Sequence, residues 1–145
     1  MKTFIPKVDG IEKKWYILDL KGVTLGHAAI ETARILRGKN KPIFTPHLDT
    51  GDFVVAINAS QMVISGNKGK KKLYYHFSGY PGGLKTASYE KMIRVNPSKV
   101  FTLAVKGMLP GNRLGRKLLK KLHVYGADKH PHQAQKPEIW KLAES

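Results

Sequence analysis

The sequence of 145 residues contains no cysteine, which excludes disulfide bonds and thiolate metal ligands. It also lacks any apolar run approaching the roughly 18 residues that a membrane-spanning helix needs. Its first residues, Met1 to Pro6, show neither the apolar stretch nor the cleavage site of a secretory signal. Together these absences favour a cytoplasmic protein in a reducing compartment.

The phosphate-binding motifs of nucleotide-dependent enzymes are missing as well. Residues 66–70 resemble a P-loop only in composition, because the GxxxxGK[ST] spacing is absent. No GxGxxG follows the first predicted strand. The sequence therefore predicts no enzyme, no catalytic residue and no cofactor.

Two histidine clusters are open to a chemical interpretation. His130 and His132, with Asp128, lie in a proline-containing segment without further ligands, so no metal site is predicted there. A general base and its orienting partners could be found in the second cluster, His47, Asp49 and Asp52. The favoured interpretation is that this second cluster caps and holds the loop before a strand.

Acidic residues are scarce, and their scarcity is uneven. The chain has 26 Lys and Arg against 10 Asp and Glu, a net charge of +16. Residues 61–125 hold fourteen basic side chains and one acidic side chain, Glu90, a net charge of +13. Such an excess repels itself in the folded state, so it favours a polyanionic partner such as nucleic acid or an anionic membrane.

The hydrophobic pattern predicts an α/β protein. Residues 15–20 form a first strand, residues 24–37 an amphipathic helix that ends at Gly38, and residues 53–57 a strand covered on both faces. This strand, helix, strand order favours a largely parallel sheet. We expect one domain over residues 1–145, with a core at about 13–126 and an irregular C-terminal tail at 127–145.

Further elements are predicted in the basic half of the chain. Residues 62–65 and 73–77 are predicted to pair as a hairpin with a lysine-rich tip. Helices are expected at residues 88–94, 97–106 and 113–122, and a short last strand at 123–125.

The predicted helix at 113–122 separates leucine from positive charge. At 100° per residue the leucines Leu114, Leu118, Leu119 and Leu122 fall within an arc of about 140°. All basic residues of this segment fall on the remaining arc: Arg113, Arg116, Lys117, Lys120 and Lys121. Solvated helix faces normally mix charge signs. A face without acid therefore predicts phosphate contact, with simple solvation as the alternative.

Weaker signals precede this helix. The predicted hairpin tip carries Lys68, Lys70, Lys71 and Lys72, which either contact RNA or protect the strand from aggregation. Tyr74, Tyr75 and Tyr80 interleave with the basic run, so base stacking is open beside a core role. The loop Gly79, Tyr80, Gly82 and Gly83 is either a plain turn or a backbone approach to phosphate.

Several motifs resemble one known family, the bacterial large-subunit ribosomal proteins of number thirteen. The likeness is carried by residues 106–110 (KGMLP), 114–116 (LGR), 121–125 (KLHVY), 130–132 (HPH) and 134–137 (AQKP). Upstream it is carried by residues 15–16 (WY), 24–26 (TLG), 37–41 (RGKNK), 45–52 (TPHLDTGD) and 78–83 (SGYPGG). Two positions depart from the family, His27 and the pair His76 and Phe77, where the family usually has an arginine.

The resemblance implies a three-layer α/β/α fold around a small, mainly parallel four-stranded sheet. It implies binding to large-subunit ribosomal RNA, a role in early assembly of that subunit, and neighbouring ribosomal proteins as partners. Carried over to this sequence, the RNA-facing positions include Lys106, Arg113, Arg116 and the loop at 79–83. Three other classes stay open on the residues alone: a DNA-binding architectural protein, a small nucleotide-binding enzyme and a membrane-surface protein.

Overall fold

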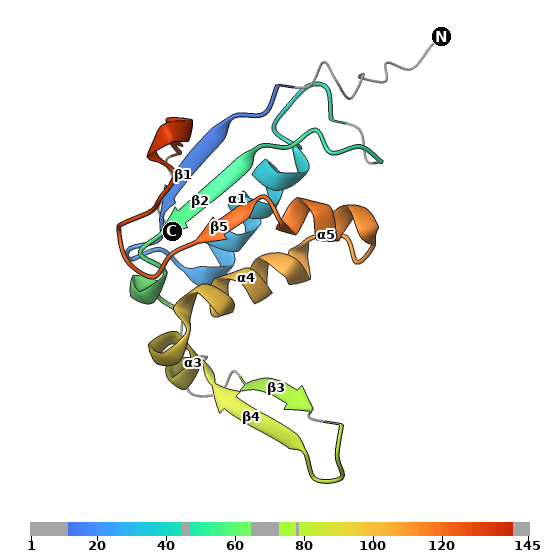
Figure 1. The fold of residues 1–145 in the computed structure, drawn as a ribbon, viewed down its shortest axis with the longest axis vertical. Helices are drawn as coiled ribbons and strands as arrows, with labels where there is room; N and C mark the ends of the chain where they lie inside the picture. The colour runs from blue at the N-terminus through green and yellow to red at the C-terminus, as the bar shows by residue number, and fades with distance from the viewer. Residues whose placement is uncertain (1–11, 45–46, 65–72, 78, 141–145) are drawn as a thin grey trace.

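Four parallel strands form the centre of the computed structural model, which describes residues 12–44, 47–64, 73–77 and 79–140 (Figure 1). The strands are β1 (Trp15–Asp19), β2 (Phe53–Ile57), β5 (Leu122–Val124) and β6 (Glu138–Ile139). Their order in the sheet is β5-β2-β1-β6, and every neighbouring pair is parallel. The predicted strand, helix, strand unit at the start of the chain is thereby confirmed.

The helix α1 (Leu25–Arg37) connects β1 to β2. Its buried positions recur at helical spacing: Leu25, Ala28, Ala29, Thr32, Ala33, Ile35 and Leu36. Ile30, the one apolar residue on its polar side, is 49% exposed. The helix ends at Gly38, as predicted, and the Gly38 amide donates to the carbonyl of Arg34.

Three further helices begin at residues whose side chains cap them. Ser88 caps α3 (Tyr89–Val95), Asn96 caps α4 (Pro97–Met108) and Asn112 caps α5 (Arg113–Leu119). In each case a side-chain oxygen accepts from the amide three residues later, which satisfies a donor that the first helical turn leaves free. The helix starts were therefore predictable, whereas α5 ends three residues earlier than predicted.

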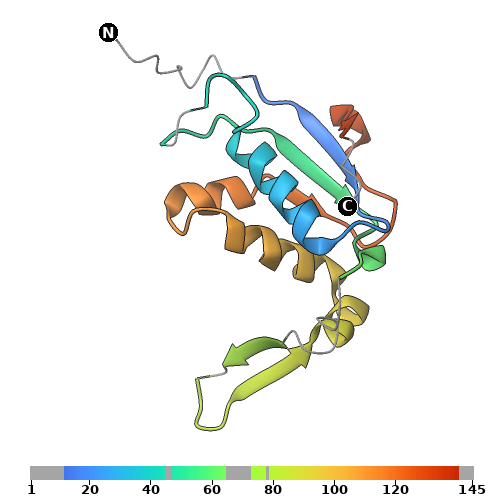
Figure 2. The same ribbon diagram turned by 180° about the vertical axis from the view of Figure 1, so that it is seen from behind.

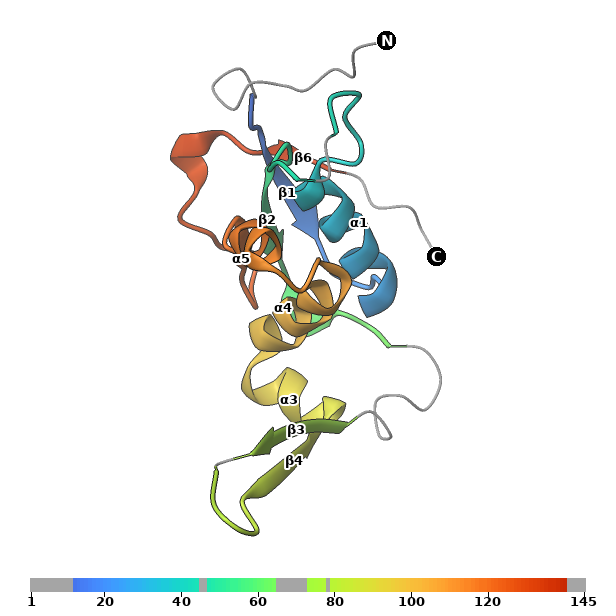
Figure 3. The ribbon, with the colours of Figure 1, turned by 90° about the vertical axis from the view of Figure 1, so that its right-hand side faces the viewer.

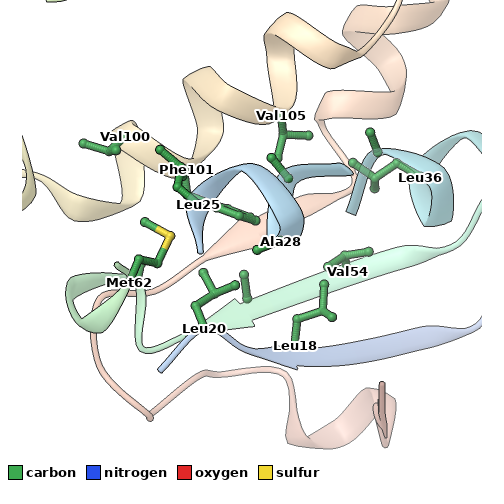
Figure 4. Packing of buried hydrophobic residues seen from close by; sticks show 14 of the residues in the cluster. Leu18, Leu20, Leu25, Ala28, Leu36, Val54, Met62, Val100, Phe101 and Val105 are labelled. Atoms are coloured by element: carbon green, nitrogen blue, oxygen red, sulfur yellow. The ribbon is translucent and has the colours of Figure 1, made fainter. Parts of the chain in front are cut away.

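The hydrophobic core lies between the sheet and these helices (Figure 4). Leu18 of β1, Leu20 directly after β1 and Val54 of β2 are fully buried against α1. On α4 the fully buried residues are Val100, Phe101 and Val105. Burial of each such side chain contributes about 1.5–3 kcal/mol, so the core fixes α4 and, through Leu118, also α5.

The opposite face of the sheet is covered by the segment after β5, which contains the short helix η3 (Gln133–Gln135). In Figure 3 this segment and α1 lie on opposite sides of the sheet. The rings of Trp15 and Phe53, neighbours in the sheet register, are stacked at 4.4 Å. His123 and His132 stack on the same indole at 5.6 Å and 5.3 Å. The predicted three-layer α/β fold around a mainly parallel four-stranded sheet is confirmed.

The hairpin was predicted from the wrong partners. Strand β3 (Leu73–Phe77) pairs antiparallel with β4 (Leu84–Ser88), not with residues 62–65. Val63 instead forms an isolated parallel bridge with Thr24, next to the short helix η2 (Ala59–Gln61). Local composition marks a strand but not its partner, which explains the error. Figures 1 and 2 show the β3–β4 hairpin extending from α3 away from the sheet.

The segment after Gly126, expected to be irregular, contributes an edge strand. Residues of β6 pair with Tyr16 and Ile17 of β1, and the amide of Trp140 donates to the carbonyl of Ile17 at 2.9 Å. A two-residue strand is too short to give an alternating pattern, so the sequence carried no signal for it. Among the described residues, no helix is both long and apolar enough to cross a membrane.

Candidate nucleic-acid interface

The helix α5 presents the densest group of exposed positive charges on one described element. Arg113, Arg116 and Lys117 lie on the helix and Lys120 forms its C-cap; all four are exposed. Leu118 on the opposite side is 1% exposed and belongs to the core. The division between leucine and basic side chains that the sequence predicted is therefore present from Arg113 to Lys120.

The end of α4 extends this basic surface. Lys106 is exposed in its last turn, and a groove of about 290 Å³ separates Lys106 from Arg116. Leu109, Pro110, Gly111, Gly115 and Leu119 complete its lining. Two cations on the rim of an otherwise uncharged groove can bind a phosphate without competition from a neighbouring carboxylate.

Gly115 determines how closely α5 approaches the end of α4. A Cβ at this position would lie 1.7 Å from the carbonyl oxygen of Pro110, which no side chain can tolerate. The amide of Gly115 also donates to Asn112, at 3.0 Å, as the helix cap. The tight turn between α4 and α5 thus holds Lys106 and Arg116 on the same groove.

Lys121 does not belong to this surface, and its assignment to the RNA-facing set is wrong. Lys121 is 5% exposed, and its Nζ donates to the carbonyl of Leu36 at 3.0 Å and to Asp49 Oδ1. The prediction extended helical geometry to residue 122. The helix ends at Leu119, so the chain turns Lys121 inward, toward the loop before β2.

The ion pair of Lys121 and Asp49 is unequally buried, which explains its pKa shifts. Burial lowers the pKa of the Lys121 ammonium, and the hydrogen bond and charge of Asp49 offset only part of that effect. Burial alone would raise the pKa of the Asp49 carboxyl, but hydrogen bonds and charges from Lys121 and Lys13 outweigh it and lower the pKa. At neutral pH the carboxylate is ionised and holds both lysines in place.

The favoured interpretation of His47, Asp49 and Asp52 was that they hold the loop before a strand. The two carboxylates do so. Asp52 is fully buried, accepts from the Lys14 amide at 2.9 Å, and pairs with Lys41 Nζ at 2.7 Å. His47 is exposed. These contacts anchor the loop before β2 to β1.

The histidines near the C-terminal end of the described chain take part in ring packing. His132 Nε2 and the Tyr125 hydroxyl form a hydrogen bond of 2.7 Å. The His132 ring stacks on Trp15 and lies 4.6 Å from the His123 ring, tilted by 44°. Burial lowers the pKa of His132, and the charge of His130 lowers it further. In the part of the chain that the structure describes, no group of three potential ligands is placed to hold a metal ion.

The glycine loop forms the tip of the hairpin. Gly79 and Gly82 have positive φ angles of 90° and 72°, and the amide of Gly83 donates to the carbonyl of Tyr80 at 2.9 Å. Tyr80 is 75% exposed. Figures 1 and 3 show this tip on the same side of the molecule as α5. Lys68, Lys70, Lys71 and Lys72 lie outside the described residues.

Sequence reasoning missed a second basic group, formed by Lys85, Lys91 and Lys99. These residues come from β4, α3 and α4 and line one groove beside the hairpin. The only signal in the sequence was the net charge of +13 over residues 61–125, which counts these lysines without placing them together.

Comparison with known proteins assigns the chain to a class and then to a family. A family model described as ribosomal protein L13 matches residues 13–131. The chain is 57% identical over 140 residues to the large ribosomal subunit protein uL13 of Carboxydothermus hydrogenoformans, covering 97% of this chain and 98% of that protein. It is 53% identical over 142 residues to uL13 of Moorella thermoacetica (98% and 99% covered), and 54% over 140 residues to uL13 of Listeria innocua (97% of both).

These matches define a ribosomal protein. More narrowly, the chain belongs to the ribosomal protein L13 family. The resemblance drawn from its motifs is thereby confirmed. Because this is a family of structural proteins of the ribosome, the prediction that the chain is not an enzyme is confirmed with it.

Proposed function

We propose that the protein binds large-subunit ribosomal RNA through the surface formed by α5, the end of α4 and the hairpin tip. By this binding it supports early assembly of the large ribosomal subunit in the cytoplasm. The residues proposed to face RNA are Lys106, Arg113, Arg116, Lys117, Lys120, Gly79, Tyr80, Gly82 and Gly83. The proposal also includes Lys68, Lys70, Lys71 and Lys72, because of their positive charge alone.

The observation that supports this proposal most strongly is the exposed face of α5. Arg113, Arg116, Lys117 and Lys120 are exposed together, and no residue of α5 is acidic. Such a face repels itself unless anions lie opposite, and RNA phosphates supply them at regular spacing. The opposite side of the helix is fixed to the core by Leu118, so the charges are held on a rigid support.

Neighbouring ribosomal proteins are the second class of partner in the proposal. The outer face of the hairpin carries Leu73, Tyr75 and Leu84, which are 45%, 64% and 58% exposed. The strand register places the three on one side of the two-stranded sheet. Apolar side chains grouped on a thin projecting element suit contact with another protein better than contact with phosphate.

Competition between nucleic acids tests the proposal directly. Labelled large-subunit ribosomal RNA is bound to the full chain, and unlabelled RNA or duplex DNA is added at equal salt. We expect RNA to compete at least tenfold better, because A-form geometry and 2′-hydroxyls distinguish it from DNA. Equal competition would instead favour a DNA-binding architectural protein or a general polyanion binder.

A cellular measurement complements this test. The endogenous protein should sediment with the large ribosomal subunit and leave it only at high salt. Sedimentation apart from ribosomal particles at low salt would contradict the proposal.

A further inference from the structure

A groove of about 660 Å³ lies between the β3–β4 hairpin and the helices α3 and α4. Its volume falls within the range of small-molecule sites. Half-buried Tyr74 and Met92 contribute to its lining, together with Ala87 and with Leu103, which is 37% exposed. Folding of this chain therefore leaves an apolar surface open to solvent here.

The hairpin supplies one wall of the groove. Tyr74 pairs with Ala87 and His76 with Lys85 in the antiparallel register, so the four side chains share one face of the hairpin. Tyr74 packs against the core, and burial raises the pKa of its hydroxyl. Its ring is therefore held by the fold beside the open part of the groove.

Positive charge surrounds this apolar surface. Lys85 lies on β4, Lys91 on α3 and Lys99 on α4, and all three are exposed. Of the described residues that line the groove, none is acidic. An apolar and aromatic interior with three cations at its border is complementary to a flat aromatic group that carries negative charge.

We propose that this groove binds a single unpaired nucleotide of the RNA, its base packed against Tyr74 and Leu103 and its phosphates near Lys85, Lys91 and Lys99. This inference rests on the proposed RNA-binding function and adds a specific site to it. Unpaired bases that leave the helical stack are the usual targets of aromatic side chains in RNA recognition. The basic face of α5 suits paired RNA, because phosphate contacts do not depend on free bases.

Two blunt-ended RNA duplexes test the proposal. One has a single-nucleotide bulge, and the other pairs that nucleotide with one added on the opposite strand, so that it has no unpaired base and carries the extra phosphate. Stacking of one base changes affinity by roughly fivefold to a hundredfold. We therefore expect the full chain to bind the bulged RNA at least fivefold more tightly, as measured by fluorescence anisotropy.

A thiol introduced into the groove shows whether the groove causes this preference. The chain has no cysteine, so Leu103→Cys provides a single thiol that a bulky maleimide can label after folding. Ile139→Cys, at a position 80% exposed on β6, is the matched control. We expect the label at residue 103 to remove the preference for the bulged RNA. The affinity for paired RNA should stay within twofold of that of the unlabelled protein. The label at residue 139 should change neither affinity.

The lysines provide a second test that does not depend on a label. The double variant Lys91→Ala with Lys99→Ala should lose more affinity for the bulged RNA than for the paired RNA. The double variant Lys21→Ala with Lys129→Ala removes the same charge from exposed positions elsewhere. It should lower the affinity for the two RNAs by the same factor. Thermal unfolding of each variant confirms that the folded protein is compared.

The outcomes separate this proposal from the function on which it rests. Equal affinity for both RNAs, or a preference that survives the label at residue 103, overturns the nucleotide site while binding of paired RNA still supports the proposed function. No binding of either RNA overturns both. If labelled Leu103→Cys binds both RNAs normally but fails to enter large subunits during reconstitution, the groove holds a protein segment and the proposal is wrong.

Discussion

At the scale of single residues, the turn between α4 and α5 has no room for a methyl group at Gly115. A Cβ would approach the Pro110 carbonyl to 1.7 Å, and both groups belong to the backbone. Gly115→Ala should therefore lower the free energy of unfolding by roughly 1–3 kcal/mol or more, as overpacked substitutions do. Urea denaturation measures this change.

Gly107→Ala is the control for this substitution. Gly107 is exposed near the end of α4, and nothing lies within 4 Å of its added Cβ. Alanine there should be neutral or stabilise the protein by up to about 1 kcal/mol, because it favours helix. Equal effects of the two substitutions would show that the α4–α5 turn is looser than described.

Single residues also show where prediction from sequence fails. Charge and helical spacing placed Arg113, Arg116, Lys117 and Lys120 on an outward face, and all four are exposed; the family resemblance added Lys106, which is exposed as well. The same rule failed at Lys121, because it depends on where the helix ends. The partner of Lys121, Asp49, is distant in sequence, and no local pattern connects the two.

At the scale of elements, α5 combines a core face with a proposed RNA face. Leu118→Ala should cost roughly 2–5 kcal/mol of stability through the cavity that it leaves. Arg116→Glu with Lys120→Glu should barely change stability, because both side chains are exposed. The double variant should bind RNA at least tenfold more weakly, because it places anions opposite phosphate.

Binding and unfolding measured on both kinds of variant test this division. Lys21→Glu with Lys129→Glu makes the same charge change outside the proposed interface and serves as the control. A comparable loss of RNA affinity in the control would mean that only total charge matters. Unfolding of the Arg116 and Lys120 variant would mean that this face of the helix is packed.

The packed rings on the face of the sheet opposite α1 predict that stability depends on pH. Burial lowers the pKa of His123, and the charge of neighbouring His132 adds to this. The unfolded chain then binds protons more readily than the folded chain. Stability is complete above the unfolded value of about 6.5 and declines as the pH falls below it. We expect lower thermal stability at about pH 5 than at pH 7.5.

His123→Phe should flatten this decline, because phenylalanine keeps a ring against Trp15 and does not titrate. The same substitution at exposed His27 is the control and should leave the decline unchanged. An unaltered pH profile in His123→Phe would assign the decline to other groups.

Element types proved easier to predict than element partners. Apolar periodicity and capping residues located β1, α1, β2, α3, α4 and the start of α5. The pairing of β3 with β4 and of β6 with β1 was missed, since both depend on contacts that composition does not encode. The groove beside the hairpin was missed for the same reason, because its lysines come from three elements.

At the scale of the whole molecule, the net charge of +16 predicts strongly salt-dependent binding. If about five to eight phosphates are neutralised, the logarithm of the affinity for RNA should fall against the logarithm of salt with a slope steeper than about −3. Anisotropy titrations over a series of salt concentrations measure this slope. An affinity that stays constant from low to physiological salt would contradict an electrostatic interface.

The order of strands in the sheet has a consequence for how the protein is made. The central pair, β1 and β2, comes from the N-terminal part of the chain, whereas residues 122–139 fill both edges of that pair. Until those residues leave the translating ribosome, both edges keep free backbone groups that other strands can join. Pairings between such distant segments also form slowly. The sheet is therefore completed late in synthesis, and a chain that ends before residue 122 keeps two open edges beside a strongly basic surface.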